Sequence, residues 1–291
     1  MAEFRMEADI IFDSHVPDGL RRALEHAGDD GFVASMPQLL HARAHAPYDN
    51  IIWNTWFTSN SEESVVTTPA GTRVIVAVHG GGIFASPERF ERTYRSSTAR
   101  ASLEGFTGQY AAKISEREVR DVLEGRLPDG TAIPVYPFAE FKAGIPDLPM
   151  RYGVISDFAM MRQSKRGYET FDRLRDDPNM IVRAGGAGPL SLYLDAAQAR
   201  HGTTCMGNWH PFNRIDPDQA QTRILFLAGN RGGQGTQDDD DHLYGYDAEY
   251  GMGGDASMHN MARYVAVARH EVSTSLRHLP FQPGLEQQVR T

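Results

Sequence analysis

A histidine followed by three glycines, His79 to Gly82, is the combination in this sequence that is best suited to chemistry. An imidazole can bind a metal ion or transfer a proton near neutral pH. Gly80, Gly81 and Gly82 carry no Cβ, so their backbone N–H groups can approach a ligand closely and stabilise an oxyanion. We therefore expect His79 to be a catalytic residue or a metal ligand and the three glycines to contact substrate.

Several other side chains could complete a metal site with His79. The sequence offers carboxylate and imidazole ligands at Asp13, His15 and His242, with His210 as another distant histidine. Zinc and hard divalent ions accept such a mixture, and an open coordination position would activate water for attack on an amide or an ester. We therefore expect a divalent metal such as zinc as the cofactor.

A second kind of chemistry centres on Cys205, the single cysteine of the chain. One cysteine excludes an intramolecular disulfide and a thiolate-rich zinc site. A thiolate nucleophile needs a nearby base, which His201 or His210 could supply. The alternative is that Cys205 is a small buried apolar residue, which is the usual role of a lone cysteine.

Two segments in the second half of the chain offer substrate contacts. The polar loop 203–213 contains Trp209 and Asn213. A last helix, predicted to begin near Asp255, places His259 and Arg263 on a stripe away from its apolar face. That stripe is either part of a site or a solvated surface that keeps the helix soluble.

The strand that must position His79 is Arg73 to Val78, which is apolar on both faces, as expected for a central strand covered by helices. Further strands are predicted at Met180 to Ala184 and at Arg223 to Ala228, and both run into glycine-rich stretches. Ligands of open α/β sheets bind at the carboxyl ends of strands. We therefore predict an α/β fold with a central, mostly parallel or mixed sheet flanked by helices and a ligand site at the glycine-rich strand exits.

Local signals give the ends of several other elements. A first strand is predicted over Ala8 to Phe12, followed by a helix over Pro17 to Ala27. Ser35, Ser86 and Ser115 are helix N-caps, and the last of these starts a capping box. The segment from residue 50 to 58 is predicted to be extended.

The length of 291 residues fits a single α/β domain over residues 1–291. The proline-rich segment 131–149 is the one place where a domain boundary is possible.

Two known families share the pattern around His79. The segment resembles the His-Gly-Gly-Gly oxyanion loop of lipase-like α/β-hydrolases, but the chain has no Gly-x-Ser-x-Gly nucleophile elbow. It also looks like the His-Gly-Gly-Gly-Ile start of zinc-dependent poly-γ-glutamate hydrolases, a resemblance that implies a metal-binding role for His79. Those enzymes have a metal-binding glutamate at the next position, where this chain has Phe84.

Composition limits the class of partner. The formal net charge of −9 argues against a nucleic-acid partner, because such proteins need a basic face. No apolar run reaches the roughly 20 residues that cross a bilayer, and the first residues lack a secretory signal. We expect a soluble, cytoplasmic protein with no membrane partner and a small-molecule substrate. The aromatic stretch Trp53 to Phe57 and the acidic, glycine-rich segment 237–254 would suit a homo-oligomer interface.

These observations leave three hypotheses for function. The first is a metal-assisted hydrolase of a small amide, peptide or ester. The second is a metal-free, Cys-dependent amide hydrolase or transferase that uses Cys205. The third is a non-catalytic ligand-binding or oligomeric assembly protein.

Overall fold

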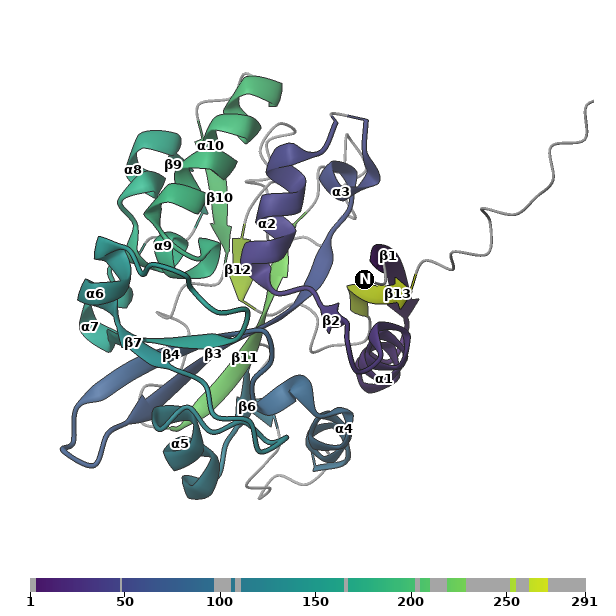
Figure 1. The fold of residues 1–291 in the computed structure, drawn as a ribbon. Coiled ribbons are helices and arrows are strands. Elements are labelled where there is room, and N and C mark those ends of the chain that lie inside the picture. The colour runs from purple at the N-terminus through teal and green to yellow at the C-terminus, as the bar shows by residue number, and fades with distance from the viewer. Residues whose placement is uncertain are drawn as a thin grey trace, which may run out of the picture.

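The computed structural model describes residues 4–47, 49–96, 106–107, 111–164, 167–201, 205–209, 219–228, 252–254 and 262–271. Within these ranges the strands form a ten-stranded sheet and a separate three-stranded sheet. Helices cover the large sheet from two sides, and the small sheet lies beside it (Figure 1). None of the helices in the described ranges is long and apolar enough to span a bilayer.

The helices in chain order are α1 (Val16–Ala27), α2 (Met36–His45), α3 (Ile51–Asn54), the 3-10 turn η1 (Ile83–Ala85), α4 (Pro87–Ser96), α5 (Glu116–Leu123), α6 (Phe138–Ala143), α7 (Phe158–Met161), α8 (Phe171–Arg175), α9 (Pro178–Ala184) and α10 (Ala187–His201). The strands are β1 (Phe4–Asp13), β2 (Phe32–Val33), β3 (Phe57–Thr67), β4 (Arg73–His79), β5 (Phe106–Thr107), β6 (Ala111–Lys113), β7 (Val135–Pro137), β8 (Tyr152–Asp157), β9 (Gly167–Thr170), β10 (Cys205–Trp209), β11 (Gln221–Leu227), β12 (Met252–Gly254) and β13 (Ala262–Glu271).

The large sheet is mixed, with the order β7-β8-β4-β3-β11-β12-β10-β9 and β6 paired to β11. Among the described strand pairs only β7–β8 and β10–β12 are parallel. The expectation of a mixed sheet flanked by helices is therefore confirmed, but a mostly parallel sheet is wrong. The reason is local, because β3 and β4 are joined by the short turn 68–72, and a short turn forces antiparallel pairing.

Strand β4 lies in the interior, as its apolar composition indicates. On one face Ile75 and Ala77 pack with residues of α2, α9 and α10, and on the other Val76 and Val78 pack against the region of α5. All residues from Val74 to His79 are buried. The sequence thus positions His79 at the end of a central strand, as predicted.

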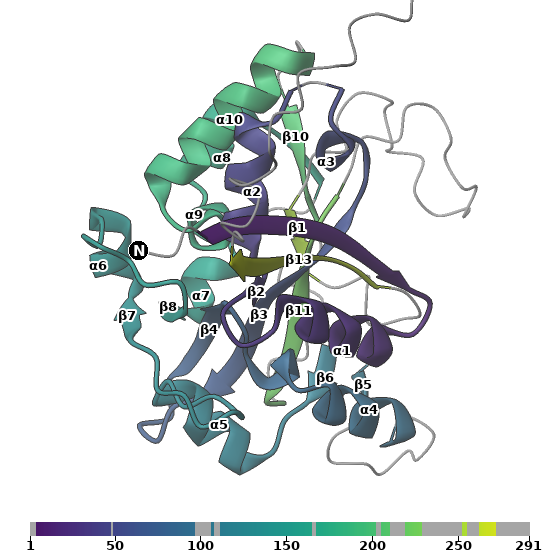
Figure 2. The same ribbon diagram turned by 45° about the vertical axis from the view of Figure 1, so that its right-hand side comes forward.

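The small sheet joins the two ends of the described chain. Strand β13 pairs along its whole length with β1, from Phe4 opposite Glu271 to Asp13 opposite Ala262. Figure 2 shows the two strands side by side at the front of the molecule, with α1 below them. The predicted last helix over this segment is wrong: Ala262, Tyr264, Ala266 and Ala268 are buried, which is the two-residue period of a strand.

A second correction concerns Met180 to Ala184, which form helix α9 and not a strand. The Asp177 side chain accepts hydrogen bonds from the N–H groups of Asn179 and Met180, and Pro178 occupies the first helical turn. Gly185 follows in the left-handed conformation, with φ 84°, as a helix C-cap. The glycines at 185–188 therefore follow a helix and not a strand.

Three further expectations can be compared with the structure. The helix starts at Ser35, Ser86 and Ser115 are confirmed. The segment 50–58, predicted to be extended, begins instead with the helical turn α3. The proline-rich segment 131–149 contributes β7, which pairs with β8 at one end of the large sheet.

Candidate functional site

The three glycines after β4 permit close contacts within the chain. Gly80 and Gly81 have positive φ values of 82° and 113°, and both N–H groups donate to the carbonyl of Asn60. A Cβ at Gly80 would lie 2.7 Å from the Met150 carbonyl oxygen. The N–H groups of Gly80 and Gly81 are thus used to hold the turn against its neighbours.

The anion next to this turn is a side chain of the protein itself. Glu62, fully buried on β3, accepts hydrogen bonds from the N–H groups of Ile83 at 2.8 Å and Phe84 at 2.5 Å. A Cβ at Gly82 would lie 2.6 Å from the same carboxylate. Burial raises the pKa of Glu62 to about 7, although both N–H groups favour the charged form. Glu62 thus lies against Gly82, one of the three glycines that we expected to contact substrate.

His79 is buried in a chain of hydrogen bonds. Its Nε2 lies 3.0 Å from the carbonyl oxygen of Val182, and its Nδ1 lies 2.9 Å from Oγ of Ser61. Since a carbonyl only accepts, Nε2 carries the proton and Nδ1 accepts from Ser61, which in turn accepts from the N–H of Met36. Burial lowers the pKa of His79 to about 4. Both ring nitrogens are engaged, so neither has a lone pair for a metal ion.

A buried ion cluster lies next to Glu62 in sequence. Glu63 accepts from Nε and Nη2 of Arg183 at 2.7 and 3.0 Å and from Nη2 of Arg223 at 2.7 Å. The three side chains are at most 1% exposed. Burial opposes ionisation of Glu63, but the two arginines outweigh it and lower the pKa to about 2. The cluster joins β3, α9 and β11.

Asp13 and His15 lie at the surface, where β1 leads into α1. Asp13 accepts from the N–H of His15 and from Arg22, and the first of these hydrogen bonds is the main reason why its pKa is lowered. His15 Nδ1 lies 2.8 Å from the Asp18 carboxylate, and its Nε2 lies 3.6 Å from that of Glu91. These contacts are ion pairs and hydrogen bonds between surface elements.

The predicted metal ligands do not meet within the described part of the chain. No group of three or more His, Cys, Asp or Glu side chains in those ranges is arranged to hold a metal ion. The remaining predicted site residues His210, Asn213, His242 and His259 lie outside the described residues, as do the side chains of Cys205 and Trp209. A metal site that includes them stays a prediction.

Arg263 lies at the start of β13, where the sequence predicted a helix. Its guanidinium carbon is 4.7 Å from the ring centroid of Trp56 and 5.3 Å from that of Phe12, and Nη1 donates to Thr55. Cation–π contacts of this kind stabilise an arginine beside aromatic rings. The Phe12 side chain remains 46% exposed, so this cluster reaches the surface.

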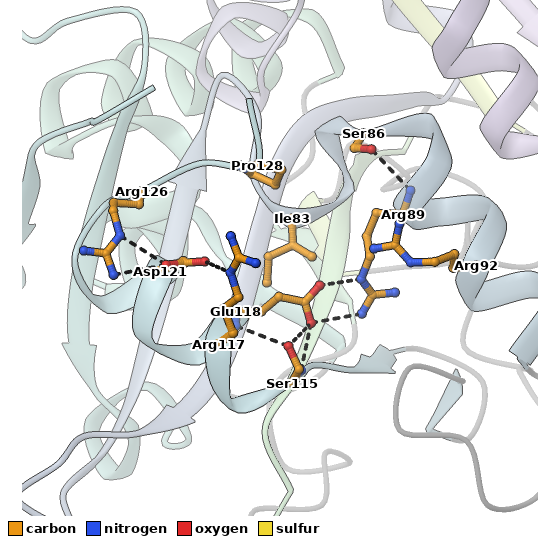
Figure 3. Close-up of a pocket in the computed structure, with 10 residues that line it drawn as sticks. All are labelled: Ile83, Ser86, Arg89, Arg92, Ser115, Arg117, Glu118, Asp121, Arg126 and Pro128. Atoms are coloured by element: carbon orange, nitrogen blue, oxygen red, sulfur yellow. Dashed lines mark hydrogen bonds and ion pairs between the residues drawn. The ribbon is translucent and has the colours of Figure 1, made fainter. Parts of the chain in front are cut away.

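A cleft of about 390 Å³ lies between α4 and α5, just after the glycine turn. In Figure 3 Ile83 lies in the middle, with Arg89 and Arg92 on one side and Arg117, Asp121 and Arg126 on the other. Ser86, Ser115, Glu118 and Pro128 complete the lining. The cleft therefore carries four arginines and two carboxylates.

Two ion-pair systems shape this cleft. Arg89 is buried and donates to Glu118 through Nε at 2.5 Å, to Thr93, and to the Lys113 carbonyl. Burial opposes the charge of Glu118, but Arg89 and the N–H of Ser115 outweigh it, so its pKa is lowered. Asp121, by contrast, is shared by two more exposed arginines. One wall of the cleft is thus rigidly held and the other is open to solvent.

A separate hollow of about 570 Å³ lies where β4 begins, beside α7. It is lined by Thr72, Arg73, Asp157, Phe158, Ala159, Arg162 and Gln163. The guanidinium carbon of Arg73 lies 5.5 Å from the Phe158 ring centroid. This hollow carries two arginines and one carboxylate, a smaller excess of positive charge than in the α4–α5 cleft.

The sequence did not single out the residues that organise this region. Glu62 and Glu63 lie between serines and valines in a strand that is buried along most of its length. Carboxylates in a buried strand need partners inside the protein, and this was the signal that could have identified them. The capping box of Ser115 was recognised, but Glu118 also binds Arg89, 29 positions away. Such pairings form only when the chain is folded.

Comparisons with known proteins place the fold. No family model matches this chain. No curated protein matches it in sequence. Its structure is similar to a solved protein described as "Accommodation of massive sequence variation in Nanoarchaeota by the C-type lectin fold", with a TM-score of 0.62 and 20% identity over 90% of this chain and 98% of the other. At this level of identity the likeness shows the fold alone, the C-type lectin fold.

Proposed function

We propose that this chain is a ligand-binding protein that recognises a small molecule without converting it. The observation that carries this proposal is the engagement of His79 and of the turn that follows it. Both ring nitrogens are hydrogen-bonded inside the core, and the N–H groups of Ile83 and Phe84 donate to Glu62. An oxyanion hole or a metal centre would need these groups to be free.

The structural likeness gives further support. The nanoarchaeal neighbour is described as accommodating massive sequence variation by the C-type lectin fold. By analogy, we infer that this chain uses its fold as a scaffold and that its surface residues determine which ligand binds. Fold likeness is an analogy and the site must carry the function.

Metal-assisted hydrolysis of an amide, peptide or ester is the second candidate. The feature that favours it is the surface position of Asp13 and His15, where the His15 ring lies beside the carboxylates of Asp18 and Glu91. This candidate needs His210 or His242 as a further ligand. Cys205-dependent hydrolysis or transfer is the metal-free version of the same hypothesis.

The experiment measures metal content, turnover and binding on one preparation of the full chain. We expect no stoichiometric metal, no hydrolysis of a panel of amides, peptides and esters, and saturable binding of a ligand from a screen. Stoichiometric metal that is lost in His15→Ala but kept in His41→Ala would overturn the proposal in favour of the hydrolase, because His41 is an exposed residue elsewhere.

The cysteine hypothesis has its own readout. Thiol labelling of the native protein reports whether Cys205 is reactive, and Cys205→Ala reports whether any turnover depends on it. Turnover that is abolished by Cys205→Ala would also overturn the ligand-binding proposal.

A further inference from the structure

We propose that the cleft between α4 and α5 binds a small molecule carrying a phosphate or sulfate group. This inference goes beyond the proposed function, because it assigns an anion site that would exist whether or not the chain also acts on another ligand.

The charges that line this cleft favour an anionic ligand. The cleft has four guanidinium groups and two carboxylates, although the whole chain has a formal net charge of −9. An excess of positive charge in a concave site concentrates anions there. The guanidinium group also presents paired donors that match the oxygens of phosphate and sulfate.

The two walls of the cleft differ in how firmly their arginines are held (Figure 3). Arg89 is 2% exposed and held by Glu118, Thr93 and Lys113, so it forms a fixed positive wall. Arg117 and Arg126 are 85% and 52% exposed, with nitrogens 3.6 and 3.1 Å from the Asp121 carboxylate. Arg126 also pairs with Glu124, whose side chain is 53% exposed. Exposed pairs of this kind contribute little to stability, so an anion can exchange with Asp121 at low cost.

The lining and the volume of the cleft suit a small organic molecule. Ile83 and Pro128 give the cleft an apolar surface between the arginines, and Ser86 and Ser115 add hydroxyl groups. A volume of about 390 Å³ exceeds what one inorganic anion fills and falls within the range of small-molecule sites. We therefore infer an organic body attached to the anionic group. The capping box of α5 uses the N–H groups of Ser115 and Glu118, and the arginines carry this inference rather than the helix end.

The test is a titration of the full chain with each probe at constant ionic strength. Calorimetry measures the binding, and the change in melting temperature is a second measurement of it. The probes are glucose 6-phosphate, glucose sulfate, inorganic phosphate, inorganic sulfate and uncharged glucose. We expect saturable binding of at least one of the charged sugars, weaker binding of the inorganic anions and none of glucose. The comparison of phosphate with sulfate identifies which anionic group the cleft prefers.

Variants at the exposed wall decide whether the cleft is the site. We expect Arg117→Gln with Arg126→Gln to weaken binding of the charged sugar by about tenfold, the effect of losing charge-assisted hydrogen bonds. Arg162→Gln is the matched control, because it removes one arginine from the separate hollow beside α7. Equal binding by the double variant and the wild type, or no saturable binding of any charged probe, would overturn the inference. Weaker binding and unchanged binding can both be interpreted, because the substituted side chains are exposed and their removal leaves the core intact.

Discussion

The carboxylate of Glu62 is enclosed by the turn that follows β4, where it accepts hydrogen bonds from Ile83 and Phe84. His79 is buried as well, and its neutral ring links Ser61 to Val182. Burial raises the pKa of Glu62 and lowers that of His79, because in each case the charged form is disfavoured. The titratable side chains of Glu62 and His79 are therefore part of the buried core.

We predict that Glu62 makes the free energy of unfolding depend on pH. The pKa of Glu62 rises from 4.5 to about 7 on folding, so the folded state binds more protons between these values. Its contribution is therefore fully present below pH 4.5 and is lost as the pH rises towards 7. We expect Glu62→Gln to remove this part of the pH dependence of the free energy of unfolding, measured by urea denaturation. The same slope in wild type and variant would contradict it.

His79 contributes to the pH dependence of the free energy of unfolding with the opposite sign. Its pKa falls from 6.5 to about 4 on folding, so its contribution is present above pH 6.5 and is lost as the pH falls towards 4. The Glu62→Gln comparison should therefore be made from pH 4.5 to 8 in both proteins, so that the effect of His79 is common to them and cancels in the difference.

At the scale of elements, the turn between β4 and α4 depends on the absence of side chains. Gly80 and Gly81 supply positive φ, and Gly82 supplies the space for Glu62. The sequence predicted that this run of glycines lets the backbone approach a ligand. The partner that approaches is a strand of the same chain, 20 positions earlier in sequence.

We predict that Gly82→Ala destabilises the fold by about 1–3 kcal/mol, the usual cost of overpacking a core. The added Cβ would lie 2.6 Å from the Glu62 carboxylate. Gly188→Ala is the control, because a Cβ at that exposed helical position meets nothing within 4 Å. Chemical denaturation of both variants measures the difference, and equal stabilities would show that the turn can open to admit the methyl group.

At the scale of the whole molecule, two features hold distant segments together. The ladder between β1 and β13 joins the first and the last described strands. The ion cluster of Glu63 with Arg183 and Arg223 connects strand β3 to a helix and a second strand that both lie more than 100 positions later in the sequence. Both features are long-range, so they form only as the fold closes.

We predict that Glu63→Ala lowers the free energy of unfolding by about 3–5 kcal/mol, because it leaves two arginines buried without their carboxylate. Glu7→Ala is the control, since the Glu7 and Arg5 side chains are 51% and 67% exposed and their pair contributes about 1 kcal/mol or less. Urea denaturation at pH 7 compares them. A Glu63→Ala variant as stable as Glu7→Ala would mean that the core reorganises around the arginines.

Signals that lie within a few residues of one another determined much of the secondary structure. The serine N-caps fixed the starts of α2, α4 and α5, and the apolar run Arg73 to Val78 gave a central strand. The N-cap Asp177 and Pro178 carried the same kind of signal for α9, although the apolar run after them was interpreted as a strand. These features are local because a hydrogen bond to a cap spans only two or three positions.

Tertiary structure decided the rest. Residues 262–271 contain apolar positions at both helical and strand spacing, and pairing with β1 selected the strand. Pairing likewise decided that the central sheet is largely antiparallel, and the pairing of β3 with β4 brought Glu62 to Ile83. The packing of α4 beside α5 brought Arg89 to Glu118. The sequence by itself determined that His79 and its glycines end a buried strand. Only the folded chain decided that the His79 ring bonds to Ser61 and Val182 and that Gly82 lies against the carboxylate of Glu62, because burial and hydrogen bonding depend on residues that are distant in sequence.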